Sequence, residues 1–130
     1  MSHELIHQAQ ELERYTAELE EHIKFLENQI QELEQFAERL TLLNKSTEKN
    51  ILSSIGKGVY LPAELKDTNL LVEVGTGVIV KKSPMELKDV VIEQISKLQE
   101  SKISLISQIG FYTQKIQEIM LEVQNSKGIS

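Results

Sequence analysis

The sequence predicts a mostly helical α+β chain, in which a long antiparallel coiled-coil hairpin carries two β-hairpins between its helices. Apolar residues recur at alternating spacings of three and four near both ends of the chain, whereas the stretch between them alternates with a period of two. Glycine and asparagine interrupt that central stretch at turn-like intervals. We therefore expect one domain over residues 1–130. Its expected parts are a helix at 4–45, a β region at 46–82, a helix at 83–125 and a short tail at 126–130.

The first helix is predicted by leucines that recur every seven residues, with small, polar or β-branched residues between them. Such a repeat, sustained over more than four heptads, is typical of a coiled coil. A helix of about 40 residues would be roughly 60 Å long and could not bury this stripe against itself, so it needs its own second arm or another chain. The leucines are Leu5, Leu12, Leu19, Leu26, Leu33 and Leu40, and the residues between them are Ala9, Thr16, Ile23, Ile30 and Ala37. The pattern ends at Asn44–Thr47, whose side chains favour a helix exit.

The central stretch predicts four short strands joined into two β-hairpins, although spacing alone leaves open which strands pair. Aliphatic residues recur at every second position within Val59–Leu65, Leu70–Val74 and Val78–Lys81, and Ile51–Ile55 supplies a fourth run. Two hairpins of this size would leave unpaired strand edges, which other subunits could cover or which closure into a barrel would remove. The residues expected to form the assembly surface are Val59, Leu61, Leu65, Leu70, Val72, Val74, Val78 and Val80.

The second helix has the clearest local start in the chain. Ser83 can cap the first free N–H groups, Pro84 suits the first helical position, and Glu86 completes a capping box. We expect the helix to stop near Asn125, with Gly128 as its terminating glycine. Its apolar seam is broken once by Lys102, which either extends past the seam to solvent or disfavours wrong alignments of the two helices. The seam is Val91, Ile95, Leu98, Lys102, Leu105, Ile109, Tyr112, Ile116, Ile119 and Val123.

Composition and charge exclude several classes of function. The net charge is −6, and residues 1–50 carry 11 acidic against 5 basic side chains, so we expect no nucleic-acid partner. The chain has no cysteine, which excludes a disulfide framework and fits a reducing compartment. Neither a signal peptide nor a membrane-spanning stretch is predicted, and we expect a cytoplasmic protein without a membrane partner.

The sequence contains no arrangement that predicts catalysis, a cofactor or a metal site. His3 and His7 share a helix face but lack a third ligand nearby, and neither Gly-x-Gly turn extends to a phosphate-binding motif. We therefore expect a protein that is not an enzyme.

Both helix ends that would meet in an antiparallel hairpin are rich in apolar residues. Ile6, Met120 and Leu121 lie off the seam, where coiled-coil packing does not need them, and methionine suits adaptable contacts. These residues either complete a fraying coiled coil or form an adhesive tip. The candidate tip residues are Leu5, Ile6, Leu12, Ile116, Ile119, Met120, Leu121, Val123 and Ile129.

The segments Pro62–Asp67 and Val74–Lys82, followed by a helix, resemble the α-type subunit of prefoldin, the family that includes eukaryotic subunit five. Two hairpins rather than one match the α-type over the β-type. This resemblance implies a heterohexamer of two α-type and four β-type subunits, in which the hairpins form a β-barrel body and the coiled coils hang from it. The source can be archaeal or eukaryotic. The short tail beyond Gly128 departs from relatives with a charged extension and puts in doubt a chaperonin contact made through it.

The function implied by the resemblance is that of an ATP-independent holdase subunit. Its tips would bind non-native polypeptides and transfer them to a group II chaperonin. The alternative is a structural coiled-coil scaffold whose hairpins mediate assembly without binding clients.

Overall fold

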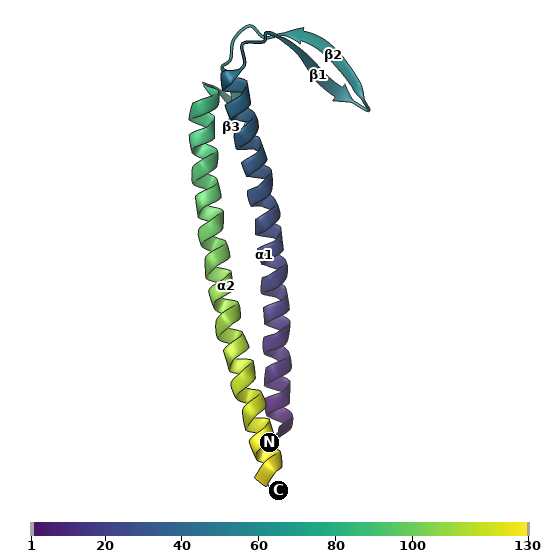
Figure 1. Cartoon of the computed structure of the whole chain (residues 1–130), viewed down its shortest axis with the longest axis vertical. Helices are drawn as coiled ribbons and strands as arrows, with labels where there is room; N and C mark the ends of the chain where they lie inside the picture. The colour runs from purple at the N-terminus through teal and green to yellow at the C-terminus, as the bar shows by residue number, and fades with distance from the viewer. Residues whose placement is uncertain (1, 130) are drawn as a thin grey trace. The chain divides into compact units, whose positions relative to one another are not determined.

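The computed structural model describes residues 2–129 of the chain, and the side chains of residues 3–126. The element order is α1 (Ser2–Lys45), β1 (Asn50–Gly56), β2 (Val59–Glu64), β3 (Leu70–Gly75), β4 (Val78–Lys82) and α2 (Pro84–Ile129) (Figure 1). The predicted fold class of two long helices with two antiparallel β-hairpins between them is confirmed. The chain divides into two compact units. Unit 1 contains the chain up to Gln31 and again from Ile95, and unit 2 contains Glu32–Gln94.

In unit 1, α1 and α2 pack side by side in opposite directions (Figure 1). Lys102 lies beside Glu27, and Tyr112 lies beside Tyr15, so residue numbers rise along one helix as they fall along the other. The predicted seam is the contact between them, because its residues are buried or half-buried while most of the residues between them are exposed. The most deeply buried seam residues of unit 1 are Ala9, Leu26, Ile30 and Val123.

The two polar residues of this seam are accommodated differently. The Thr16 hydroxyl donates a hydrogen bond of 2.9 Å to the carbonyl oxygen of Leu12 in the preceding turn, so it needs no partner across the interface. The Lys102 ammonium instead reaches to the edge of the seam and pairs with the Glu27 carboxylate of α1 at 3.3 Å. The side chain of Lys102 is 32% exposed. Lys102 therefore extends toward solvent and also has a specific partner in Glu27.

In unit 2, the helix ends follow the local sequence signals. α1 ends at Lys45, where the N–H of Ser46 bonds the carbonyl oxygen of Leu43. At the start of α2, the Ser83 hydroxyl accepts a hydrogen bond from the N–H of Glu86 at 3.2 Å, which confirms the predicted N-cap. The Glu86 carboxylate accepts a bond from the Ser83 hydroxyl at 3.1 Å, and this replaces the bond to the Ser83 N–H of a full capping box.

The two hairpins are formed by consecutive strands, which resolves the pairing that spacing left open. β1 pairs with β2 from Asn50 opposite Glu64 to Gly56 opposite Val59. β3 pairs with β4 from Leu70 opposite Lys82 to Gly75 opposite Val78. Each pair forms its own two-stranded sheet, so within residues 2–129 every strand has one edge without a strand partner.

The first hairpin turns at Lys57 and Gly58, whose φ angles are 52° and 77°. Positive φ at both central residues is the pattern of a type I′ turn, whose twist matches that of the paired strands. Glycine takes this conformation without strain, and lysine takes it at some cost. The predicted Gly-Lys-Gly turn is therefore confirmed as a strand connection.

The second helix extends further than its sequence indicates. α2 continues through Gly128 to Ile129 instead of ending near Asn125, so Gly128 does not terminate it. Glycine weakens a helix by about 1 kcal/mol relative to alanine, but it retains its N–H and does not block the hydrogen-bond ladder as proline would. No proline follows Pro84 in the chain. The expected tail at 126–130 is accordingly helical as far as Ile129.

Candidate functional site

The free helix ends of unit 1 hold the predicted tip residues, and the structure separates them into two groups. Four residues on the seam face the other helix and are half-buried: Leu5, Leu12, Ile116 and Ile119. Val123, also on the seam, is only 4% exposed and is not available to a ligand while the helices are paired. The side chain of Ile129 lies outside the described residues.

The three off-seam residues are the ones that remain open to solvent. Ile6 is 36% exposed, and Met120 and Leu121 are exposed further. Leu121 and Met120 line a shallow groove of about 400 Å³ on α2 together with Ile116 and the amide side chains of Gln117 and Gln124. The uncharged lining of this groove suits an apolar side chain with a neighbouring backbone group, rather than an ion.

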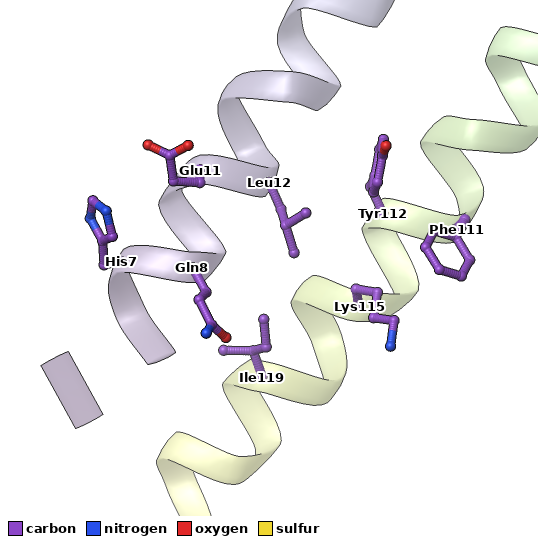
Figure 2. A pocket seen from close by; sticks show the side chains of 8 residues that line it. All are labelled: His7, Gln8, Glu11, Leu12, Phe111, Tyr112, Lys115 and Ile119. Atoms are coloured by element: carbon purple, nitrogen blue, oxygen red, sulfur yellow. The ribbon is translucent and has the colours of Figure 1, made fainter. Parts of the chain in front are cut away.

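A second groove of about 380 Å³ lies between the helices of unit 1, close to their free ends. Figure 2 shows Leu12 and Ile119 pointing toward the space between the two helices. His7 and Glu11 lie at the α1 side of the groove, and Phe111 and Lys115 lie on α2 (Figure 2). The remaining lining residues are Gln8 and Tyr112. The groove has an apolar floor and a rim that carries both signs of charge.

Aromatic rings form one side of this groove. Tyr112 stacks against Tyr15 of α1, with ring centroids 6.3 Å apart, and contacts Phe111 edge-on at 5.8 Å. The Lys115 ammonium lies 5.7 Å from the centroid of the Phe111 ring, within the range of a cation–π contact. Arg14 makes a similar contact with Tyr15 at 5.6 Å and pairs with Glu11. The cluster presents rigid apolar surface at a small cost in side-chain entropy.

Sequence reasoning about the tip missed this aromatic cluster. Phe111 lies off the seam and is 58% exposed, so a search for heptad positions passes over it. An available signal was the adjacency of Phe111 and Tyr112, because two neighbouring aromatic residues cannot both face the same seam of a helix.

The hairpins of unit 2 carry the predicted assembly residues on a largely uncovered surface. Val59, Leu61, Val74 and Val78 are exposed, whereas Leu65, Leu70, Val72 and Val80 are half-buried. In the second hairpin, the half-buried residues share one face, and the opposite face, with Leu71 and Ile79, is exposed. The first hairpin exposes apolar side chains on both faces, including Leu52 and Tyr60, which the predicted set omitted.

Residues with the chemistry for metal binding do not cluster in the part of the chain that the structure describes, where no group of three His, Cys, Asp or Glu side chains could hold an ion. Within the same residues, neither helix has a stretch that is both long enough and apolar enough to cross a membrane. Contacts between apolar surfaces are thus the main chemistry that the tip and the hairpins offer.

Comparisons with known proteins agree with this arrangement. Residues 12–127 match the family model of the prefoldin subunit. Among solved structures, the fold is similar to that of a filamentous prefoldin from Methanocaldococcus jannaschii, with a TM-score of 0.76. That alignment covers 89% of this chain and 98% of the other. The sequence identity is 21%, so the similarity shows a shared fold. A comparison with curated protein sequences found no match.

Prefoldins are oligomers of prefoldin subunits and belong to the chaperones, which accords with hairpins whose strand edges are open. The family match covers α1 from Leu12 onward, all four strands and nearly the whole of α2. This chain belongs to the prefoldin family and is a chaperone-type subunit.

Proposed function

We propose that this chain is an α-type prefoldin subunit that acts as an ATP-independent holdase in the cytoplasm. In this proposal two copies assemble with four β-type subunits, and the tips bind non-native polypeptides before transfer to a group II chaperonin. The observation that carries the proposal is the exposure of Ile6, Met120 and Leu121 at the free helix ends, off the seam that joins the helices. The presence of two hairpins supports the α-type assignment.

The groove beside the tip supports the same function. An apolar floor of Leu12 and Ile119 can accept an aliphatic or aromatic side chain, and the exposed ring of Phe111 can stack against it. Contacts of this kind are individually weak and lack a fixed hydrogen-bond pattern. Weak, adaptable contacts allow a client chain both to be bound and to be released without a nucleotide cycle.

The hairpins support assembly as the second role of the chain. Each two-stranded sheet has open edges within the described residues, and exposed apolar side chains lie along them. A two-stranded hairpin is at best marginally stable alone, and pairing with a neighbouring strand satisfies the free N–H and C=O groups. We therefore propose that the hairpins hold the oligomer together.

The tip assignment is tested by a triple variant, Ile6→Ser, Met120→Ser and Leu121→Ser, in the assembled complex with a β-type partner. Because the four β-type subunits keep their own tips, we expect this complex to suppress the aggregation of a chemically unfolded protein, followed by light scattering, less than the original complex does at the same concentration. Phe25→Ser is the matched control, because Phe25 is also an exposed apolar residue but lies away from the helix ends. Full suppression by the triple variant would refute the tip assignment.

The alternative is a scaffold subunit whose hairpins assemble the complex without binding clients. The open hairpin edges favour assembly in either case, so the aggregation assay separates the two functions. Mass measurement of the chain alone and with a β-type partner tests assembly itself. A stable monomer in both samples would contradict the role of the hairpin edges, whatever the outcome at the tip.

A further inference from the structure

The middle of α2 in unit 1 has a composition that its coiled-coil role does not require. Residues 103–114 contain no charged side chain on any face of the helix. Lys102 and Lys115 lie directly before and after this stretch. A solvent-exposed helix normally carries charged residues opposite its packed seam. Here Ile103 is 67% exposed and Ile106 is 50% exposed, and neither belongs to the seam with α1.

These two isoleucines belong to a longer row along one face of α2, which we call the neutral strip. Its members are three or four residues apart, so they lie one above another on the helix surface. The row extends over roughly 25 Å at 1.5 Å per residue. Every member is exposed, and none carries a charge: Ile103, Ile106, Gly110, Thr113, Gln117 and Met120.

The neutral strip lies on the opposite side of the helix pair from the aromatic groove. The α2 residues that line the groove are Phe111, Tyr112, Lys115 and Ile119, and none of them belongs to the strip. The strip follows the seam on its other flank, where Lys102 pairs with Glu27 of α1. The two surfaces can therefore bind different partners.

On α1, three glutamates flank the same side of the seam, with Lys24 between two of them. Glu13, Glu20 and Glu27 are seven residues apart and so lie in one row, which we call the glutamate row. Glu27 contacts Lys102 of α2 at 3.3 Å, which places the row beside the strip. Among the described residues, Glu13 and Glu20 make no ion pair. Lys24 lies four residues after Glu20 on α1, and α2 carries no charged side chain at 103–114.

We propose that the neutral strip and the glutamate row together dock an amphipathic helix whose apolar stripe is bordered by lysine or arginine. The strip supplies positions for side chains at helical spacing, as in helix-in-groove recognition. The unpaired carboxylates of Glu13 and Glu20 would meet the basic border of the partner, and such complementarity selects the partner and its orientation. The occupant is another protein rather than a second copy of this chain, because a second copy would place its own glutamate row against this one.

This surface goes beyond the proposed holdase function, because Ile103 and Ile106 lie several turns from the helix ends that carry the tip residues. The docking of a basic amphipathic helix does not require non-native clients. Met120 belongs both to the strip and to the tip, so the test of the strip changes only Ile103 and Ile106, which are not tip residues. Loss of tip activity in a variant that keeps Met120 would therefore leave the binding of such a helix intact, and the two proposals fail independently.

The test uses the full chain and a fluorescent designed peptide that forms a helix with one leucine stripe bordered by lysines. We expect binding, followed by fluorescence anisotropy, to weaken on addition of salt. Ile103→Ser with Ile106→Ser should weaken it about tenfold, since two apolar contacts lose most of their buried area. Glu13→Gln with Glu20→Gln should weaken it about threefold to tenfold, the range of two partly exposed charge pairs.

Two controls test whether the position and the sign of the charges matter. Glu18→Gln with Glu21→Gln removes the same two charges from α1 off the glutamate row and should change binding less than twofold. A peptide with glutamates in place of the lysines should bind far more weakly than the basic peptide. Circular dichroism of each variant shows whether the helices are retained.

Three results would overturn the proposal. The first is equal binding of the basic and acidic peptides, and the second is unchanged binding by the well-folded Ile103→Ser, Ile106→Ser variant. The third is a change in the oligomeric mass of this variant when the chain is measured alone, which would make the strip a contact between copies.

Discussion

Replacing Lys102 with isoleucine is expected to stabilise the helix pair of unit 1. Lys102 occupies a seam position where all its seam neighbours on α2 from Val91 to Val123 except Tyr112 are aliphatic, and its ammonium lies 3.3 Å from Glu27. The two side chains are 32% and 50% exposed, so the ion pair contributes only about 0.2–1 kcal/mol. Full burial of an isoleucine contributes about 1.5–3 kcal/mol, and a site that is two-thirds covered realises about 1–2 kcal/mol of this.

The difference between these terms is a net gain of about 1 kcal/mol, which corresponds to a rise in Tm of about 4 °C for a chain of this size. Thermal unfolding followed by circular dichroism measures it, in samples matched for concentration and oligomeric state. Glu27→Gln provides the second arm of a double-mutant cycle: it should lower stability by up to about 1 kcal/mol in the original chain and have no effect in the Lys102→Ile background.

An unchanged or lower Tm for Lys102→Ile, in a variant that keeps the same oligomeric state, would refute this reasoning. It would mean that the ion pair, or the alignment it enforces, contributes more than an aliphatic side chain can replace. Equal effects of Glu27→Gln in both backgrounds would refute the pairing of the two side chains.

Further predictions concern caps and glycines. Ser83→Ala removes the N-cap acceptor of Glu86 and should lower stability by about 1 kcal/mol, whereas Ser96→Ala, at an exposed position within the helix, should not lower it; urea titration measures both. Gly110→Ala should raise stability by about 1 kcal/mol, because an added Cβ meets no atom within 4 Å and α2 gains helix propensity; an unchanged or lower Tm would contradict this. Gly58→Ala has the same free space but a φ of 77°, so it should lower stability by about 1 kcal/mol or more, and no loss in a thermal melt would contradict the turn assignment.

The coiled-coil seam was predictable from the sequence because one physical requirement dominates it. A helix that buries a stripe against another helix must repeat its apolar residues every three or four positions. The alternation in the centre was equally informative, since a two-sided strand has a period of two. Strand pairing was not predictable in this way, because any two strands of similar length satisfy the same alternation. The structure shows that β1 pairs with β2 and β3 with β4.

The candidate site was predictable in part. Ile6, Met120 and Leu121 could be identified because they are apolar where the seam does not need them, and the structure leaves them exposed. Val123 was included for its position near the end of the helix, and its burial at 4% follows from its place on the seam. The groove lined by Leu12, Phe111 and Ile119 could not be identified, because it depends on which residues of α2 lie opposite which residues of α1.

The amino-acid sequence by itself determined the type and order of the elements, the seam that joins the helices and the turns that break the strands. These follow from local rules of periodicity, capping and backbone conformation. Only the tertiary structure decided the strand partners, the pairing of Lys102 with Glu27, the aromatic cluster around Tyr112 and the two distinct sides of the helix pair. The contacts between the helices depend on the relative alignment of segments far apart in the chain, which heptad patterns leave undetermined because each seam repeats every seven residues.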